Sequence, residues 1–227
     1  MTEEFFYHYT TQRAAKDIFL SGKILPSHTA DGDAVHGDGV YLTTLEPRLG
    51  RETVMNNNWD GLVGSMDKEI DVYFEIFMPS IKVKRAQEKR DIQVYTGALQ
   101  LSDYKWSLKN WDGELLATEH FMISSQGLAV HDQTDLMGRY TLARNIVMYD
   151  YSPVYKQDEG VYFLFRVKSG DWVVGPIVGY DKGSLKQDGG SVQHPASPLK
   201  TRPWKHVSAD TPSGWQEDVT IKVYPRY

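Results

Sequence analysis

The sequence predicts an α+β protein in which strands and short helices share the N-terminal half and a small β-rich domain follows. Two observations carry this expectation. An aromatic run at residues 5–9 precedes a stretch with helical spacing, and from Gly138 onward short apolar runs alternate with Gly and Pro. The length of 227 residues corresponds to one or two domains.

The first elements follow from local chemistry. The aromatic residues 5–9 favour a buried strand. Thr10 or Thr11 is suited to cap a helix over residues 12–20, and Gly22 supplies its stop. The apolar face of this helix is formed by Ala15, Ile18 and Phe19.

The rest of the N-terminal half alternates between extended and turn-forming segments. Residues 24–27 are extended because of a proline, and residues 29–39 form a turn rich in Gly and Asp. Further strands are predicted at 40–43, 71–78 and 91–95, a helix at 47–59, and a hairpin connection at 81–90. Residues 102–137 read as a mixture of short helices and loops.

The C-terminal part has the pattern of an all-β module. Runs at 161–167 and 172–174 flank a turn signal at 168–171, which predicts a hairpin, and residues 219–223 alternate as a terminal strand. We therefore expect three parts: a domain over 1–105, a connecting segment over 106–137 and a β-rich accessory domain over 138–227.

Composition excludes several classes of protein. The chain has no cysteine, so disulfides, thiolate metal sites and a cysteine nucleophile are excluded. No apolar run is long enough to cross a membrane, and the acidic N-terminus lacks a secretory pattern, so we expect a cytoplasmic protein. Residues 1–137 carry 13 Lys and Arg against 21 Asp and Glu, a net −8, whereas 138–227 carry 12 against 9, a net +3. Neither part is basic enough to indicate nucleic-acid binding.

Three segments of the N-terminal half carry chemistry in a fixed order. They are Tyr-His-Tyr-Thr at 7–10, Gly-Asp-Gly-Val-Tyr-Leu-Thr at 37–43 and Arg-Asp-Ile-Gln-Val-Tyr at 90–95. With the Pro-Ser segment at 26–27, this order resembles the ADP-ribosyltransferase superfamily, in particular the H-Y-D signature class of its poly(ADP-ribose) polymerase-like branch. The resemblance covers roughly the first 100 residues. It implies an ADP-ribosyltransferase-like split β core that uses NAD as a substrate and needs no metal.

Cleavage of the nicotinamide–ribose bond builds positive charge on the ribose, and an enzyme accelerates it by binding that charged state. We therefore assign catalytic roles to three residues. His8 would hydrogen-bond a ribose hydroxyl, Tyr41 would stack on nicotinamide, and Asp91 would engage the 2′-hydroxyl and offset the charge. The resemblance further implies that NAD is contacted by His8, Tyr9, Thr10, Ser27, Gly39, Tyr41 and Trp59. The backbone of Tyr9 is expected to hold the carboxamide.

Two departures from the polymerase pattern narrow the expected reaction. Tyr9 stands where the branch usually has glycine, and Asp91 stands where it has the longer glutamate. The resemblance therefore implies mono-ADP-ribosyl transfer or NAD hydrolysis, not chain elongation. The acceptor stays open between protein, nucleic acid, small molecule and water.

Alternatives accompany each assignment. Glu75 and Glu119 are rival acids, and each predicted catalytic residue taken alone is more typical of an ordinary structural residue. The acidic turn at 31–39 lacks the order of a calcium loop, and the basic run at 81–90 is typical of a solvated hairpin tip, although it could meet a pyrophosphate. The whole chain could also be a catalytically inactive module that binds NAD or ADP-ribose. For residues 138–227 the default role is structural or the binding of a protein partner.

Overall fold

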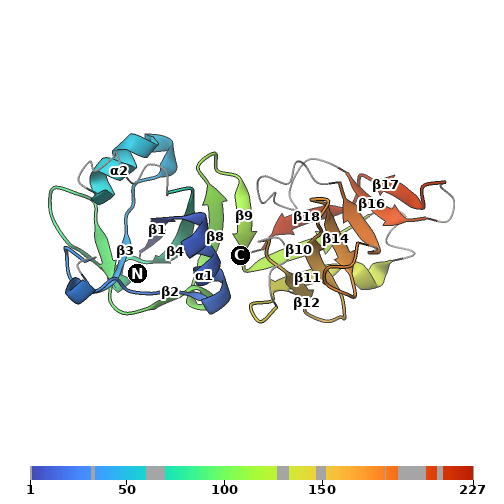
Figure 1. Ribbon diagram of the computed structural model, residues 1–227, viewed down its shortest axis with the longest axis horizontal. Helices are drawn as coiled ribbons and strands as arrows, with labels where there is room; N and C mark the ends of the chain where they lie inside the picture. Colours follow the sequence, from blue (N-terminus) through green and yellow to red (C-terminus); the bar gives the residue numbers. More distant parts are fainter. Residues whose placement is uncertain are drawn as a thin grey trace. The chain divides into compact units, whose positions relative to one another are not determined.

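The computed structural model describes residues 2–31, 34–59, 70–126, 133–146, 152–181, 183–188, 203–208 and 212–226. The chain divides into two compact units, Met1–Leu115 and Leu116–Tyr227, whose elements are labelled in Figure 1. Strands account for 43% of the structure, and the described residues contain two α-helices. This confirms the β-rich α+β character that the sequence predicts.

The first unit contains two main sheets and two helices. The four-stranded sheet has the order β1 (Glu3–Thr10), β4 (Val72–Pro79), β8 (Lys105–Asn110), β9 (Leu115–Thr118), and the chain enters the second unit within β9. A three-stranded sheet has the order β3 (Val40–Leu42), β6 (Gln93–Tyr95), β5 (Val83–Arg85). The other described elements are the pair β2 (Lys23–Ile24) and β7 (Leu99–Gln100) and the helices α1 (Gln12–Ser21) and α2 (Arg51–Trp59). Short 3-10 helices occur at η1 (Thr29–Asp31), η2 (Pro47–Leu49), η3 (Ser80–Lys82) and η4 (Leu101–Asp103).

Helix α1 forms where the sequence predicts it, and for the predicted reasons. The Thr11 hydroxyl accepts a hydrogen bond from the Ala14 N–H at 3.0 Å, and Gly22 ends the helix in a left-handed conformation with φ of 70°. The predicted apolar face, Ala15, Ile18 and Phe19, is buried. The Phe19 ring meets Trp106 of β8 edge to face, with centroids 5.6 Å apart, so α1 covers one face of the four-stranded sheet.

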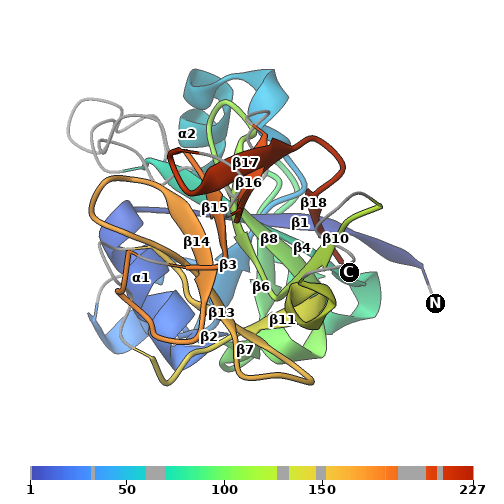
Figure 2. The same cartoon turned by 90° about the vertical axis from the view of Figure 1, so that its right-hand side faces the viewer.

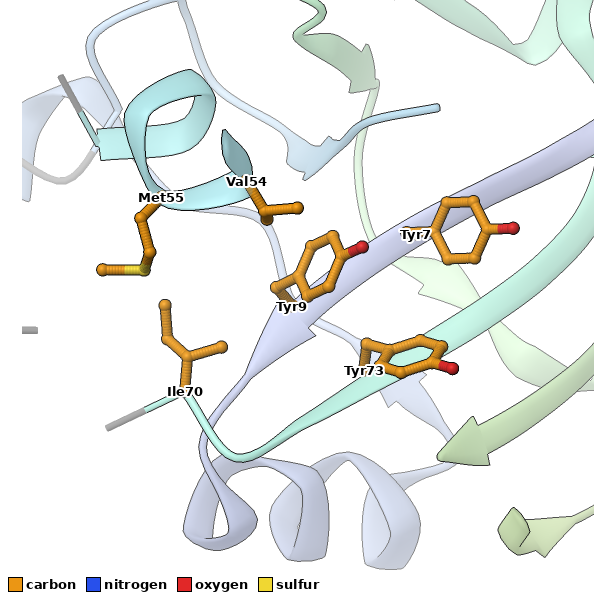
Figure 3. Packing of buried hydrophobic residues seen from close by; sticks show 6 residues of the cluster. All are labelled: Tyr7, Tyr9, Val54, Met55, Ile70 and Tyr73. Atoms are coloured by element: carbon orange, nitrogen blue, oxygen red, sulfur yellow. The ribbon is translucent and has the colours of Figure 1, made fainter. Parts of the chain in front are cut away.

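Helix α2 contributes to a cluster on the opposite face of that sheet. We call Tyr7 and Tyr9 of β1 and Tyr73 of β4 the tyrosine cluster. Figure 3 shows the three rings projecting from neighbouring strands with their hydroxyl groups pointing the same way, and the Tyr9 ring beside Val54 of α2. Their ring centroids lie 5.6–6.3 Å apart, so the rings pack directly against one another.

Residues 102–137, which span the boundary between the two units, differ in part from the sequence expectation. Residues 102–137 were expected to hold short helices and loops. They do contain two short 3-10 helices, η4 (Leu101–Asp103) and η5 (Thr134–Leu136), but also three strands that the expectation did not include, β8, β9 and β10 (His120–Ser124). The expectation was wrong there because Trp106, Ser107 and Leu108 are all buried, so β8 lacks the alternation by which a strand is recognised. The division at Leu115–Leu116 lies inside the predicted connecting segment 106–137.

The described residues of the second unit form one antiparallel sheet of nine strands. Its order is β17 (Trp215–Asp218), β16 (Trp204–Val207), β15 (Leu185–Gln187), β14 (Trp172–Gly175), β13 (Phe163–Arg166), β12 (Tyr155–Gln157), β11 (Gly138–Leu142), β10, β18 (Lys222–Pro225). Figure 2 shows the succession from β17 through β14. The predicted hairpin is confirmed as β13 and β14, with the Gly170 N–H bonded to the Val167 carbonyl in the turn at 2.8 Å.

The two edges of this sheet are consecutive along the chain. Only residues 219–221 join β17 to β18, so the sheet must curl to bring its two edges near each other. The predicted terminal strand at 219–223 is wrong in its first part, because these residues form a turn. The Asp218 carboxylate holds that turn by accepting from the N–H and the hydroxyl of Thr220, at 2.8 and 2.6 Å.

Candidate functional site

Strand β3 is joined to the edge of β1 by one bridge and then separates from it. Tyr7 and Thr43 exchange two backbone hydrogen bonds, of 2.8 and 3.1 Å. Because backbone groups alternate in direction along a strand, the N–H and C=O of Tyr9 also face β3. A regular ladder would pair Tyr9 with Tyr41 next, but no hydrogen bond to the Tyr9 backbone groups occurs on that side within the described residues.

The His8 side chain contacts the Tyr41 carbonyl, which would accept from the Tyr9 N–H in a regular ladder. Its Nδ1 lies 3.1 Å from the carbonyl oxygen of Tyr41. A carbonyl only accepts, so Nδ1 carries the hydrogen and a neutral ring keeps Nε2 as an acceptor. Burial lowers the pKa of His8 from its usual value near 6.5, against a smaller opposing effect of the Tyr41 carbonyl. The imidazole is therefore neutral at pH 7.

Tyr41 lies at the centre of β3, between buried Val40 and Leu42. Its hydroxyl donates to the Gly37 carbonyl at 2.9 Å and accepts from the His36 N–H at 2.8 Å. These two bonds tie the phenol ring to the turn that precedes the strand, so the ring orientation is fixed before any ligand arrives.

Gly39 and Ser27 hold the start of β3 in place. The two residues exchange backbone hydrogen bonds of 2.9 and 3.1 Å. A Cβ atom added at Gly39 would lie 2.6 Å from the Tyr95 carbonyl oxygen and 2.5 Å from a methyl group of Val94. Glycine is therefore required at this position because β6 packs against its Cα.

Asp91 lies in the loop before β6, and its carboxylate is bound by its own chain. One oxygen, Oδ2, accepts from the hydroxyls of Thr43 and Thr44, both at 2.8 Å, and from the Thr44 N–H at 2.5 Å. The other, Oδ1, accepts from the Gln93 amide at 2.8 Å. Burial acts to raise the pKa of Asp91, but these hydrogen bonds outweigh it, so the net pKa is lowered and the group is ionised near neutral pH.

The three predicted catalytic residues therefore meet around one short segment, residues 41–44. His8 contacts the carbonyl of Tyr41, and Asp91 is bound through Thr43 and Thr44. His8, Tyr41 and Asp91 come from separate parts of the sequence; His8 contacts the first residue of this segment and Asp91 its last two, while the Tyr41 hydroxyl is bound to Gly37 and His36.

The other predicted NAD contacts have different surroundings. The Tyr9 hydroxyl donates to the Leu45 carbonyl at 2.8 Å, and its ring belongs to the tyrosine cluster. Thr10 ends β1, where its carbonyl accepts from the Asp71 N–H. Trp59, at the end of α2, packs against the larger apolar cluster that joins these tyrosines to Val54, Met55 and Ile70.

Sequence reasoning missed Asn57, a residue of α2. Its side-chain oxygen accepts from the Asp91 N–H at 2.8 Å, and its amide donates to the Asp91 carbonyl at 2.9 Å. The available signal was three consecutive asparagines, residues 56–58, in a predicted helix, because asparagine is a poor helix former.

The rival acids each have a basic partner. Glu75 of β4 forms an ion pair with Lys109 of β8 and accepts from the Ser107 hydroxyl at 3.2 Å. Glu119 belongs to the second unit, where Arg144 binds both of its oxygens. Glu75 pairs with Tyr7 in the strand register, so it lies on the same face of the sheet as the tyrosine cluster. The pKa of Tyr73 is raised to about 12, mainly by burial and also by the negative charge of Glu75.

The acidic turn is closed by hydrogen bonds. Asp38 accepts from the N–H and the hydroxyl of Thr29 at 2.7 and 2.8 Å, and these bonds lower its pKa to about 2. His28 lies 3.3 Å from the other oxygen of Asp38. Asp33 lies outside the described residues. Among the residues that the structure describes, no cluster of three or more His, Cys, Asp or Glu could hold a metal ion.

The predicted hairpin connection at 81–90 contains the strand β5. Its Arg85 donates to the carbonyls of Gln87 and Glu88, at 3.1 and 3.2 Å, and Arg90 donates to the Asn57 carbonyl at 3.2 Å. Both arginines thus hold the loop that leads to Asp91.

Comparison with known proteins gives no match, whether with family models, with curated sequences or with solved structures. Among the helices in the described ranges, none is long and apolar enough to span a membrane.

Proposed function

We propose that the chain is an NAD-consuming enzyme that cleaves the nicotinamide–ribose bond and transfers mono-ADP-ribose to an acceptor or to water. The observation that carries the proposal is the break in the ladder between β1 and β3. Within the described residues it leaves the backbone groups of Tyr9 without partners on that side, next to His8 in the sequence and facing β3. A carboxamide has one acceptor and one donor group, and it matches the C=O and N–H of a free peptide edge.

The chemistry follows from the same groups. The bond between the nicotinamide nitrogen and the ribose C1′ breaks, and its electron pair leaves with nicotinamide. The positive charge on the ribose is then quenched by a lone pair of the acceptor, which releases a proton. Neutral His8 offers Nε2 as an acceptor to a ribose hydroxyl, and ionised Asp91 supplies negative charge near the same strand.

Nicotinamide release tests the proposal. In the first assay the full chain is incubated with NAD, and the free nicotinamide is measured by chromatography. In the second assay the full chain and labelled NAD are added together to a cell lysate, and labelled products are measured. We expect nicotinamide in the first assay, with or without labelled targets in the second. If neither nicotinamide nor labelled product forms, the proposal is wrong.

One observation favours a second function, binding without turnover. Four donors of the chain itself already occupy both oxygens of Asp91, so a ribose hydroxyl would have to share them. A module of this kind would be stabilised by NAD in a thermal-shift assay without releasing nicotinamide. The two assays run side by side separate the two functions.

A further inference from the structure

We propose that Asn57 is a positioning residue that sets the location of the Asp91 carboxylate. The inference rests on the proposed function, because Asp91 is the negative group of the proposed reaction. Both the carboxylate and the backbone of Asp91 are bound by other residues of the chain. Thr43, Thr44 and Gln93 bind its carboxylate. Asn57 binds its backbone.

The contact between Asn57 and Asp91 has the hydrogen-bond pattern of two paired residues in neighbouring strands. The Asn57 oxygen accepts from the Asp91 N–H at 2.8 Å, while the Asn57 amide donates to the Asp91 carbonyl at 2.9 Å. A side-chain amide thus satisfies both backbone groups of a loop residue, as a neighbouring strand would. Helix α2 thereby fixes a point in the loop between β5 and β6.

Asn57 also reaches the carboxylate through one intermediate. Its amide lies 3.4 Å from the Thr43 hydroxyl, and that hydroxyl donates to Oδ2 of Asp91 at 2.8 Å. The Arg90 guanidinium, next to Asp91 in sequence, donates to the Asn57 carbonyl at 3.2 Å. Asn57 is therefore hydrogen-bonded to Asp91, to Thr43, whose hydroxyl donates to the Asp91 carboxylate, and to Arg90, the neighbour of Asp91 in the sequence.

This arrangement predicts an effect on the chemical step more than on NAD binding. Loss of Asn57 frees the Asp91 backbone and lets the carboxylate shift, and a displacement near 1 Å can cost about 100-fold in rate. The groups expected to bind NAD, on His8, Tyr9 and Tyr41, are held by contacts that do not involve Asn57. We therefore expect kcat to fall with little change in KM.

The test compares two variants of the same helix. Asn56 is exposed, one position before Asn57, and its side chain makes no hydrogen bond with the part of the chain that the structure describes, so Asn56→Ala is the matched control. Asn57→Ala should lower kcat for nicotinamide release about 10- to 100-fold with KM within about 2-fold, and Asn56→Ala should match the wild type. If the two variants have the same kcat, the inference is overturned while the proposed function stands.

A double-mutant cycle shows whether Asn57 acts through Asp91. In a chain that already carries Asp91→Asn, we expect Asn57→Ala to change kcat by less than about 2-fold. An equal loss in both backgrounds would mean that Asn57 acts independently of Asp91, and the inference fails. Radiolabelled NAD and long incubations make the slow variants measurable.

Asn57→Asp is a second variant that tests the same contact if Asn57→Ala does not fold. The aspartate still accepts from the Asp91 N–H but presents an acceptor to the Asp91 carbonyl, so kcat should fall here as well. Unchanged kcat in Asn57→Asp would show that the paired contact is not needed. A wild-type chain that releases no nicotinamide would overturn both this inference and the proposed function.

Discussion

Gly39→Ala tests whether the close packing of β3 on β6 holds the first unit together. The added Cβ would lie 2.6 Å from the Tyr95 carbonyl oxygen and 2.5 Å from a Val94 methyl group. Such contacts need about 3.5 Å, so the neighbours must move by about 1 Å. The Val94 methyl group can rotate away, but the Tyr95 carbonyl belongs to the backbone of β6 and moves only with the strand.

The cost follows from these two contacts. Overpacking of this kind costs about 1–3 kcal/mol, and the loss of one strand hydrogen bond beside Val40 and Tyr95 adds about 1 kcal/mol. The total of about 2–4 kcal/mol corresponds to a fall in the melting temperature of the first unit of about 8–16 °C, at about 4 °C per kcal/mol.

The assay is thermal unfolding of the full chain, with hydrogen exchange to locate the loss in β3 and β6. Gly37→Ala is the control, because no atom lies within 4 Å of its added Cβ and only the positive φ of 97° is strained. That strain costs about 1 kcal/mol. If Gly39→Ala melts no lower than Gly37→Ala, the packing argument is refuted.

Three further predictions concern the first unit. Tyr9→Phe should cost about 1 kcal/mol in denaturant unfolding, because the Leu45 carbonyl loses its donor. Tyr7→Phe should cost less than about 0.5 kcal/mol, because the Tyr7 hydroxyl makes no hydrogen bond within the described ranges. Equal losses would contradict this reasoning. The pKa of His8 is lower in the folded state than in the unfolded state, so as the pH falls His8 is protonated in the unfolded chain before it is protonated in the folded one. The free energy of unfolding should therefore fall as pH drops below about 6.5. His8→Asn should weaken that fall, and an unchanged pH dependence would count against it. Thr11→Ala removes the cap of α1 and should cost about 1 kcal/mol, visible as faster hydrogen exchange in that helix; unchanged exchange would exclude a role for the cap.

The elements that the sequence predicts well are those with local causes. Helix α1 has its cap at Thr11, its stop at Gly22 and one apolar face, and all three depend on residues within one stretch. The hairpin of β13 and β14 likewise depends on its own turn. In contrast, β8 is buried on both faces, so its pattern reflects neighbours that are distant in sequence.

The candidate site shows the same division. The order of His8, Tyr41 and Asp91 along the chain could be read from motifs. Their hydrogen bonds could not, because Asp91 meets Thr43 and Asn57 across separations of 48 and 34 residues. An aspartate at a strand start gives no sign that four donors of its own chain bind it.

The most direct test of the proposed NAD cleavage is the rate of nicotinamide release by the full chain and by Asp91→Asn. Asp112→Asn is the matched control, since Asp112 is exposed and its side chain makes no hydrogen bond among the described residues. Glu75→Gln and Glu119→Gln test the rival acids. We predict that the wild type releases nicotinamide, that Asp91→Asn lowers kcat about 100-fold or more, and that Asp112→Asn does not. Wild-type protein without nicotinamide release, or a larger loss in Glu75→Gln or Glu119→Gln than in Asp91→Asn, would contradict the proposed role of Asp91.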